Sequence, residues 1–414
     1  MTLSRKIRRR QFLRGSLAAG MTLGLGPRFL LRQASAQTPP GRAMICIFMR
    51  GAVDGLNMVV PHGESRYFDL RGSIAIPRPG AAEGALDLDG FFGLHPAMSA
   101  LQPMFGDGEL AVVHACGSPD ETRSHFDAQD YMETGTPGDK TTTDGWINRH
   151  LQTMPPATET TLRAVSVTGT VPRALSGPAA VYAAASLIDI EFGRGRQGDL
   201  ARAAIADMYR ERTDLIGTTV HETLANYQLF TSLEGYTPAN GAAYPSAPLG
   251  RQLREVAQVL KSNLGVEVAF LEVGGWDTHA NQGGSDGRLA GLLRTLADSI
   301  AAFRTDMGNG MDDVCLVTMS EFGRTAAING SGGTDHGHGT AMLALGGTVK
   351  GGQVYGDWPG LASSQLHQGR DLDVTTDFRT FFAEVVERHL GNDQIGTVFP
   401  DFQYGGGTRL GLIA

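Results

Sequence analysis

Runs of apolar residues of strand length recur along the chain, each followed by a polar turn and a stretch with helical spacing. The apolar runs cover residues 43–49, 109–114, 162–167, 266–273 and 313–319. Continuous runs of this length are typical of strands that are buried on both faces of a sheet. Apolar residues near a 3.6-residue period predict helices over residues 124–133, 198–230, 248–263, 287–303 and 378–389.

This alternation predicts an α/β fold, with a mostly parallel central sheet and helices on both of its faces. In such sheets, ligands bind beyond the carboxyl ends of the strands. Polar residues follow four of the predicted strands, namely Asp54, Ser124, Asp277 with His279, and Glu321. We therefore expect these side chains to gather at one edge of the sheet.

The first 36 residues differ in kind from the rest, because they contain eight basic residues and no acidic one. Residues 9–13 read RRQFL, a twin-arginine motif, and residues 34–36 read ASA, a small-residue cleavage pattern. The interpretation that we favour is a leader that binds the twin-arginine export machinery and is cleaved after Ala36. The protein is then expected in the periplasm or outside the cell. A basic amphipathic arm and an uncleaved membrane anchor are the alternatives.

Composition limits the classes of protein to which the chain after the leader can belong. Of the 414 residues, 41% are hydrophobic and 19% are charged, which is enough apolar material for a large core. Without the leader, 27 basic residues face 43 acidic ones, a net charge of −16, which argues against nucleic-acid binding. No later apolar run reaches the length of a membrane span. We expect one domain over residues 37–414, with a helical insertion over residues 182–245 that caps the site.

Metal-ligand residue types are concentrated in two short segments. The glycine-rich segment 333–339 contains Asp335, His336 and His338, and the segment GGWDTH contains Asp277 and His279. With the carboxylates that follow the first and fifth strands, these side chains offer enough nitrogen and oxygen donors for one or two divalent cations. Taken singly, each has a structural alternative. An aspartate after a strand often caps a helix, and His338 is as readily a solvated loop residue.

Four sequence blocks together resemble a known family. They read MRGAVDGLN, ETRSHFDAQDYMETG, GGWDTHANQ and SEFGRTAAINGSGGTDHGHGT. These blocks, after a twin-arginine leader, resemble the exported family called domain of unknown function 1501. That family is distantly similar to the alkaline phosphatase and sulfatase superfamily. The resemblance implies an α/β sheet that holds one or two divalent metals beside a nucleophile that attacks phosphorus or sulfur.

Carried over residue by residue, the resemblance implies that Asp277, His279 and His336, with Asp335 beside them, hold a first metal. It implies that Asp54 and Glu321 hold a second metal. The sequence departs from the superfamily pattern at Phe322, where a histidine is expected, and in the short spacing of the Asp277 and His279 pair. The second position would then have oxygen ligands alone, which favours Mg, Ca or Mn, whereas imidazoles at the first favour Zn or Mn.

The remaining predicted residues concern catalysis. Ser124 is the preferred nucleophile and Thr122 its rival, although Ser124 could instead serve only as a helix cap. His279 and His338 are candidates for proton transfer, and His125 is a further candidate catalytic residue. Arg324, with Arg50 and Arg123, is a candidate for binding ester oxygens or for a structural ion pair.

The function predicted from these residues is that of an exported, metal-dependent hydrolase of phosphate or sulfate esters, acting by in-line displacement on a small molecule or glycan. An alternative is a non-catalytic metal-containing binding or scaffold protein of the same fold. A periplasmic redox protein is a weaker alternative, because the chain has fourteen methionines but no haem-attachment or blue-copper pattern.

Overall fold

The computed structural model describes residues 41–155, 162–187, 195–231, 235–405 and 407–414. The predicted leader, its twin-arginine motif and its cleavage site lie outside these described residues. Across the part of the chain that is described, no helix is both long and apolar enough to cross a membrane.

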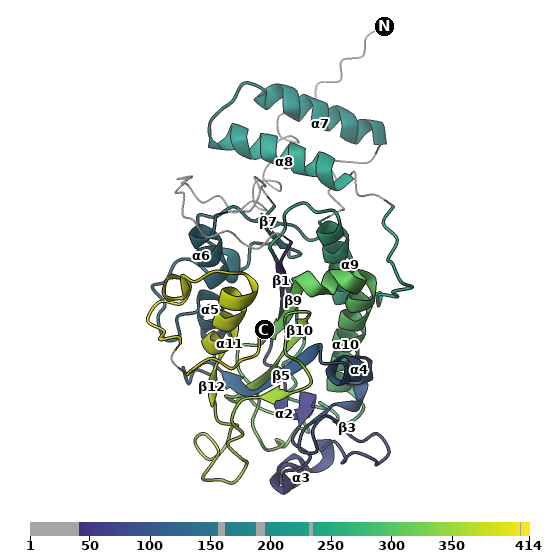
Figure 1. The fold of residues 1–414 in the computed structure, drawn as a ribbon, viewed down its shortest axis with the longest axis vertical. Helices are drawn as coiled ribbons and strands as arrows, with labels where there is room; N and C mark the ends of the chain where they lie inside the picture. Colours follow the sequence, from purple (N-terminus) through teal and green to yellow (C-terminus); the bar gives the residue numbers. More distant parts are fainter. Residues whose placement is uncertain (1–40, 156–161, 188–194, 232–234, 406) are drawn as a thin grey trace.

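A mixed, mostly parallel sheet forms the centre of the molecule (Figure 1). Nine strands of the described chain belong to it, in the order β11-β5-β10-β9-β1-β8-β6-β7, with β12 also paired to β5. Their bounds are β1 (Ala43–Met49), β5 (Leu110–Gly117), β6 (Ala164–Ser166), β7 (Tyr182–Ala183), β8 (Val268–Val273), β9 (Val314–Met319), β10 (Thr340–Gly346), β11 (Val354–Tyr355) and β12 (Thr376–Asp377). The central strand β1 runs parallel to both of its neighbours, β8 and β9, and all seven of its residues are buried. The predicted α/β sheet is confirmed.

Helices cover both faces of this sheet, as Figure 1 shows for α9 and α10 on one side and α5, α6 and α11 on the other. The first layer comprises α4 (Gln102–Gly106), α9 (Pro248–Lys261) and α10 (Arg288–Met307). The second comprises α5 (His125–Thr134), α6 (Trp146–Thr153), α11 (Phe378–Glu384) and α12 (Ile395–Val398). Each layer closes its own apolar core, because alternate side chains of β1 point to opposite faces: Ile45 and Ile47 into one, Met44 and Cys46 into the other. The three cysteines of the chain are free and buried.

Shorter elements complete the fold. A small antiparallel sheet comprises β2 (Val59–Val60), β3 (Leu86–Asp87) and β4 (Gly93–Leu94). The other short helices are α2 (Gly55–Met58), α3 (Ser65–Arg71), η1 (Gly72–Ile74), η2 (Pro96–Leu101), η3 (Arg173–Leu175), η4 (Gly308–Asp313) and the π-helix η5 (Val385–His389).

The antiparallel strand β10 was not predicted from the sequence, and it matters for the site. It lies between β5 and β9 and runs opposite to both. Its first residue, Thr340, therefore lies at the edge where the parallel strands end. The glycine-rich segment 333–339 enters the sheet at that edge, beside the residues that follow β1, β8 and β9.

The segment predicted as one helix over residues 198–230 forms two helices, α7 (Gly195–Tyr209) and α8 (Leu215–Thr231), which pack as a hairpin. Figure 1 shows this hairpin at the end of the molecule opposite α2, the helix that directly follows β1. The predicted role of this insertion as a cap over the site stays a prediction. The insertion is smaller than expected, because β7 belongs to the central sheet. An amphipathic pattern predicts that a segment is helical, but it contains no information about where an insertion docks.

Candidate metal centre

Turns after three parallel strands and the segment before β10 bring the polar residues together. Gly51 follows β1, Asp277 follows β8, Glu321 follows β9, and His336 precedes β10. Gly51 has a φ of +113°, and a Cβ on it would lie 2.8 Å from the backbone nitrogen of Asp277. Only glycine allows these two turns to approach so closely. His125, the first residue of α5, completes the group.

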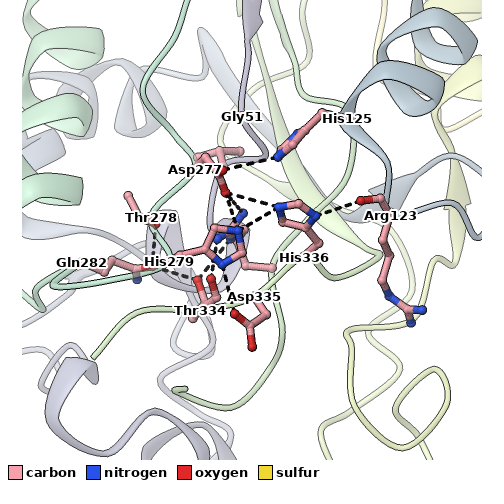
Figure 2. Close-up of polar contacts among 12 residues, drawn as sticks. Gly51, Arg123, His125, Asp277, Thr278, His279, Gln282, Thr334, Asp335 and His336 are labelled. Carbon is pink, nitrogen blue, oxygen red and sulfur yellow. Dashed lines mark hydrogen bonds and ion pairs between the residues drawn. The ribbon is translucent and has the colours of Figure 1, made fainter. Parts of the chain in front are cut away.

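Three imidazoles converge on the carboxylate of Asp277 (Figure 2). The Nε2 atom of His279 lies 3.0 Å from Oδ1 of Asp277, and that of His336 lies 3.4 Å from the same oxygen. The Nε2 atom of His125 lies 3.6 Å from Oδ2. His125, Asp277 and His336 each place one ligand atom within 4.8 Å of the others. The structure thus brings together the predicted first-metal residues Asp277, His279 and His336, and adds His125, which was predicted as catalytic.

Each of the three rings is oriented through its other nitrogen. Nδ1 of His125 lies 2.8 Å from the carboxylate of Glu321, and Nδ1 of His279 lies 3.0 Å from that of Asp335. Nδ1 of His336 lies 2.8 Å from the backbone oxygen of Arg123. All three partners only accept hydrogen bonds, so in the neutral rings Nδ1 carries the proton and Nε2 carries the lone pair. Imidazoles that bind metals in proteins are oriented in this way.

The Nε2 lone pairs lack satisfactory partners in the protein itself. The Nε2 atoms of His279 and His336 lie 2.9 Å apart, and with both Nδ1 atoms protonated these two acceptors face one another. Within the described residues, the buried Nε2 atom of His125 has no hydrogen-bond partner. The mutually close donor set of His125, Asp277 and His336, with His279 beside the last two, fits a divalent metal, and Zn²⁺ or Mn²⁺ is favoured by its nitrogen donors.

The electrostatics favour the ligand forms of Asp277 and His336, but not that of His125. Burial opposes ionisation of Asp277, but the hydrogen bond and the charge of Arg324, with the neighbouring His279 and His125, together outweigh it and hold the pKa of the carboxyl below its usual range. Arg324 donates to Oδ1 of Asp277 over 2.6 Å and is itself buried. Burial lowers the pKa of His336, which favours the neutral imidazole. The hydrogen bond to Glu321 raises the pKa of His125.

Two predicted ligands instead orient the histidines. Glu321 is fully buried and accepts from His125, from Gln129 and from the backbone of Gly51, each over 2.8 Å. Burial would raise the pKa of Glu321, but the hydrogen bonds from His125 and Gln129 hold it below its ordinary value. Asp335 accepts from Asn329 and from His279. Both carboxylates therefore act on the centre through a histidine.

Asp54 lies in a buried ion pair with Arg71, which contacts both of its carboxylate oxygens. Gln282 donates to Asp54 over 2.6 Å and accepts from Thr278 and Thr334. Asp54 is thus paired with Arg71 and Glu321 is bonded to His125, and neither belongs to a group of metal-ligand type found among the described residues. No sequence signal singles out Arg71, because its role depends on the packing of α3 against the turn that follows β1 and contains Asp54.

The candidate nucleophiles lie just before α5. Ser124 is the N-cap of this helix, and its hydroxyl accepts from the backbone of Asp127 over a long 3.5 Å. The hydroxyl of Thr122 accepts from the backbone of Ser124. Ser124 thus caps the helix, which was the structural alternative to its role as nucleophile. The cap also positions His125, the next residue.

The arginines near the site are all paired. Arg324 binds Asp277 and Thr334, and Arg123 binds Asp371. Arg50 pairs with Glu133 and Glu272. For each of these three arginines, the structure shows the ion pair that the sequence left as the alternative to ester binding.

His338 does not join the Asp277 group. Its ring stacks on His367, with centroids 4.3 Å apart, and burial lowers its pKa. These two histidines and Asp373 form a second group of metal-ligand type.

Comparison with known proteins identifies the family. The model of the family described as "Protein of unknown function (DUF1501)" matches residues 41–400. The chain belongs to the DUF1501 family. The resemblance noted in the sequence is confirmed, and the match includes every residue of the centre described above. No curated protein matches the chain.

Several solved structures resemble this DUF1501 chain at low identity. The C-terminal periplasmic domain of EcEptC from Escherichia coli, solved with Zn, is 11% identical with a TM-score of 0.38, over 90% of this chain and 89% of that one. Alkaline phosphatase from the Antarctic bacterium TAB5 is 11% identical with a TM-score of 0.32, over 74% and 92%. The lipoteichoic acid synthase LtaP from Listeria monocytogenes is 8% identical with a TM-score of 0.32, over 70% of this chain and 60% of that one. Scores this low support no argument about the activity of this chain.

Proposed function

We propose that this DUF1501 protein is an exported, metal-dependent hydrolase of phosphate or sulfate esters. The observation that carries the proposal is the convergence of three oriented Nε2 atoms on the carboxylate of Asp277. The centre lies at the strand-end edge where α/β proteins bind ligands. The motif resemblance to the alkaline phosphatase and sulfatase superfamily supports the same reaction class.

In this proposal, Asp277, His125, His279 and His336 hold one divalent cation. A cation in such a centre supplies Lewis-acid polarisation of an ester oxygen and neutralisation of its charge. Glu321, Asp335 and the backbone oxygen of Arg123 fix the three rings and keep a proton on each Nδ1. Arg324 keeps Asp277 ionised. Ser124, one residue before His125, is the candidate hydroxyl for attack on the ester.

The test is an ester assay combined with elemental analysis on untagged protein that has been purified without chelator. The panel contains an aryl phosphate, an aryl phosphodiester and an aryl sulfate. We expect the wild type to contain metal and to hydrolyse at least one ester. We expect His336→Gln and Asp277→Ala to lose ester hydrolysis and the metal bound at the Asp277 group, whereas the matched control His221→Gln, on the distant hairpin, keeps both. Equal metal content in wild type and both site variants would overturn the proposal.

A non-catalytic metal-containing binding or scaffold protein is the second candidate. It is favoured by the pairing of Arg50, Arg123 and Arg324 and by the use of Ser124 as a cap. The same experiment separates the two candidates. Metal that is lost in His336→Gln, together with no turnover of any ester by the wild type, would support the binding protein.

Export is part of the proposal and rests on the sequence. The twin-arginine motif, the apolar stretch and the ASA pattern are the supporting features.

A further inference from the structure

A second group of metal-ligand side chains lies apart from the Asp277 group. One ligand atom each of His338, His367 and Asp373 lies within 4.8 Å of the others. We call these three residues the His338 cluster. Nδ1 of His367 lies 3.7 Å from Oδ1 of Asp373, and its Nε2 lies 3.9 Å from a carboxylate oxygen of Glu121. Both distances exceed a hydrogen bond, so the polar atoms of the cluster face one another without bonding.

The histidines of the cluster are largely buried, and one ring nitrogen of His367 has no partner among the described residues. His338 is 7% exposed, and the side chain of His367 is 15% exposed. Among the described residues, nothing forms a hydrogen bond with the buried Nε2 atom of His367. Desolvated polar atoms are normally satisfied, so this buried imidazole nitrogen, beside a second buried histidine, calls for a ligand. The carboxylates of Asp373 and Glu121 are 47% and 62% exposed, which leaves a path from solvent.

The backbone holds this arrangement in place without any ion. The backbone nitrogen of Gly339 donates to the oxygen of Leu372 over 2.8 Å, which sets His338 beside Asp373. A Cβ on Gly339 would lie 2.7 Å from the backbone oxygen of Asp373, so only glycine lets the two backbone segments lie this close together. The turn that contains His367 is closed by paired backbone hydrogen bonds to Asp371.

Asp371 anchors that turn. It is fully buried and pairs with Arg123 over 2.6 Å and with Arg370 over 2.9 Å. The ligands of the cluster are thus preorganised by groups that do not belong to it, as built metal sites require.

We propose that His338, His367 and Asp373 bind a second divalent cation, with Zn²⁺ as the best fit to two imidazoles and a carboxylate. Nδ1 of His367 lies 3.7 Å from Asp373 and the unpartnered Nε2 lies 3.9 Å from Glu121, so a cation beside either ring nitrogen has a carboxylate within reach. The site differs in every residue from the second position predicted at Asp54 and Glu321, and it does not depend on the hydrolase proposal.

The site would stabilise the loop that supports the Asp277 group. Arg123 pairs through its guanidinium with Asp371 in the His367 turn, and its backbone oxygen accepts from His336. A cation in the His338 cluster would therefore order the segment 366–374, on which Arg123 depends. We assign this site a structural role.

The test counts zinc in untagged protein that has been stripped with a chelator, reloaded with Zn²⁺ alone and desalted. We expect about two equivalents in the wild type and about one in each of His367→Gln, Asp373→Asn and His336→Gln. We expect almost none in His336→Gln combined with His367→Gln. His221→Gln and Asp357→Asn serve as matched controls and keep both equivalents.

Hydrogen exchange adds a readout that is independent of activity. Zinc should slow exchange over residues 366–374 in the wild type and in His336→Gln, but not in His367→Gln. Asp373 is half exposed, so its variant remains informative if His367→Gln fails to fold. The proposal is overturned if both cluster variants bind as much zinc as the wild type. A single wild-type equivalent that only His336→Gln removes would overturn it as well. A single equivalent that only the cluster variants remove would support this site and contradict the metal at Asp277.

Discussion

At the scale of single residues, the side chains that orient the metal ligands are as informative as the ligands themselves. Glu321 is buried and has one oxygen bonded to His125, Gln129 and Gly51. A residue type alone does not distinguish a ligand from the group that positions a ligand, because both are carboxylates. The difference emerges only when the imidazole of His125 is seen between Glu321 and Asp277.

This role of Glu321 predicts the effect of Glu321→Gln. The amide no longer presents a charged acceptor to Nδ1 of His125, so the ring loses its preferred tautomer and orientation. We expect metal affinity at the Asp277 group to fall about 10- to 100-fold, with the fold retained. Competition with a fluorescent zinc chelator measures the affinity. Glu211→Gln, an exposed change, is the control, and an unchanged dissociation constant would contradict the role.

Ser124 combines two roles that its alanine variant separates. Loss of the cap should cost about 1 kcal/mol of the free energy of unfolding. Loss of an attacking hydroxyl should lower kcat by more than about 1000-fold. We expect both effects in Ser124→Ala. Thr122→Val should leave kcat unchanged, measured on the ester that the wild type hydrolyses best. A stability change with kcat preserved would leave Ser124 as a cap alone.

His114 predicts a pH dependence of stability. It is buried in β5, its Nε2 contacts the backbone oxygen of Val59 over 3.0 Å, and its ring stacks on Phe92. Burial lowers its pKa to about 4, whereas in the unfolded chain the ring protonates near pH 6.5. Between these values the unfolded state binds more protons, so the free energy of unfolding falls as the pH decreases through this window.

We expect His114→Gln to reduce this acid-dependent loss by about 2–3 kcal/mol between pH 7 and pH 4.5. Glutamine retains a donor for the oxygen of Val59 but does not titrate. Urea unfolding at the two pH values measures the difference. His221→Gln controls for the removal of an exposed histidine. The same loss in wild type and His114→Gln would show that His114 does not contribute.

At the scale of elements, the hairpin α7–α8 stands apart from the sheet and its chemistry. The described residues on either side of the hairpin form hydrogen bonds with two neighbouring residues of α9. The backbone nitrogen of Leu187 donates to Glu255 over 2.7 Å, and the backbone oxygen of Tyr236 accepts from Arg254 over 2.9 Å. The two attachment points are adjacent in sequence, so a short linker can bridge them.

Replacing residues 190–233 with a short glycine and serine linker should therefore preserve the fold and the centre. We expect metal content and ester hydrolysis within about twofold of the wild type, because the hairpin lies opposite the strand-end edge (Figure 1). Thermal unfolding and the assays described above measure this. A loss of activity with the melting temperature retained would show that the hairpin contributes to the site.

At the scale of the whole molecule, folding must precede export if the twin-arginine leader is used. The mature chain has a large double core on both faces of its sheet, and its cysteines are free and buried. Packing, rather than disulfides, therefore stabilises this fold, which suits a protein that folds in a reducing compartment.

The twin-arginine pair in the leader predicts which export route the protein uses. Changing Arg9 and Arg10 together to lysine keeps the charge of the leader but removes the motif. We expect the double variant to remain inside the cell with its leader attached, while the wild type is recovered outside the cytoplasm with Gln37 first. Fractionation with N-terminal sequencing measures both. As a control, changing Arg5 and Lys6 to glutamine should leave export intact, and export of the double lysine variant would exclude this route.

Much of this protein follows from its sequence. Buried apolar runs determine β1, β8 and β9, because a strand that is covered on both faces must be apolar throughout. Since parallel strands end at one edge, the residues after β1, β8 and β9 had to meet, as Gly51, Asp277 and Glu321 do. The resemblance to the DUF1501 family came from the same segments.

The tertiary structure alone decided the division of labour among these polar groups. Arg71 neutralises Asp54, and Glu321 orients His125. Because β10 runs antiparallel to β9, the segment before it, which contains His336, lies at the edge where the parallel strands end. Each of these outcomes depends on contacts between residues far apart in sequence, and their distances are set by packing of the two cores. A linear pattern specifies which groups reach an edge, but only the packed fold determines which atom faces which.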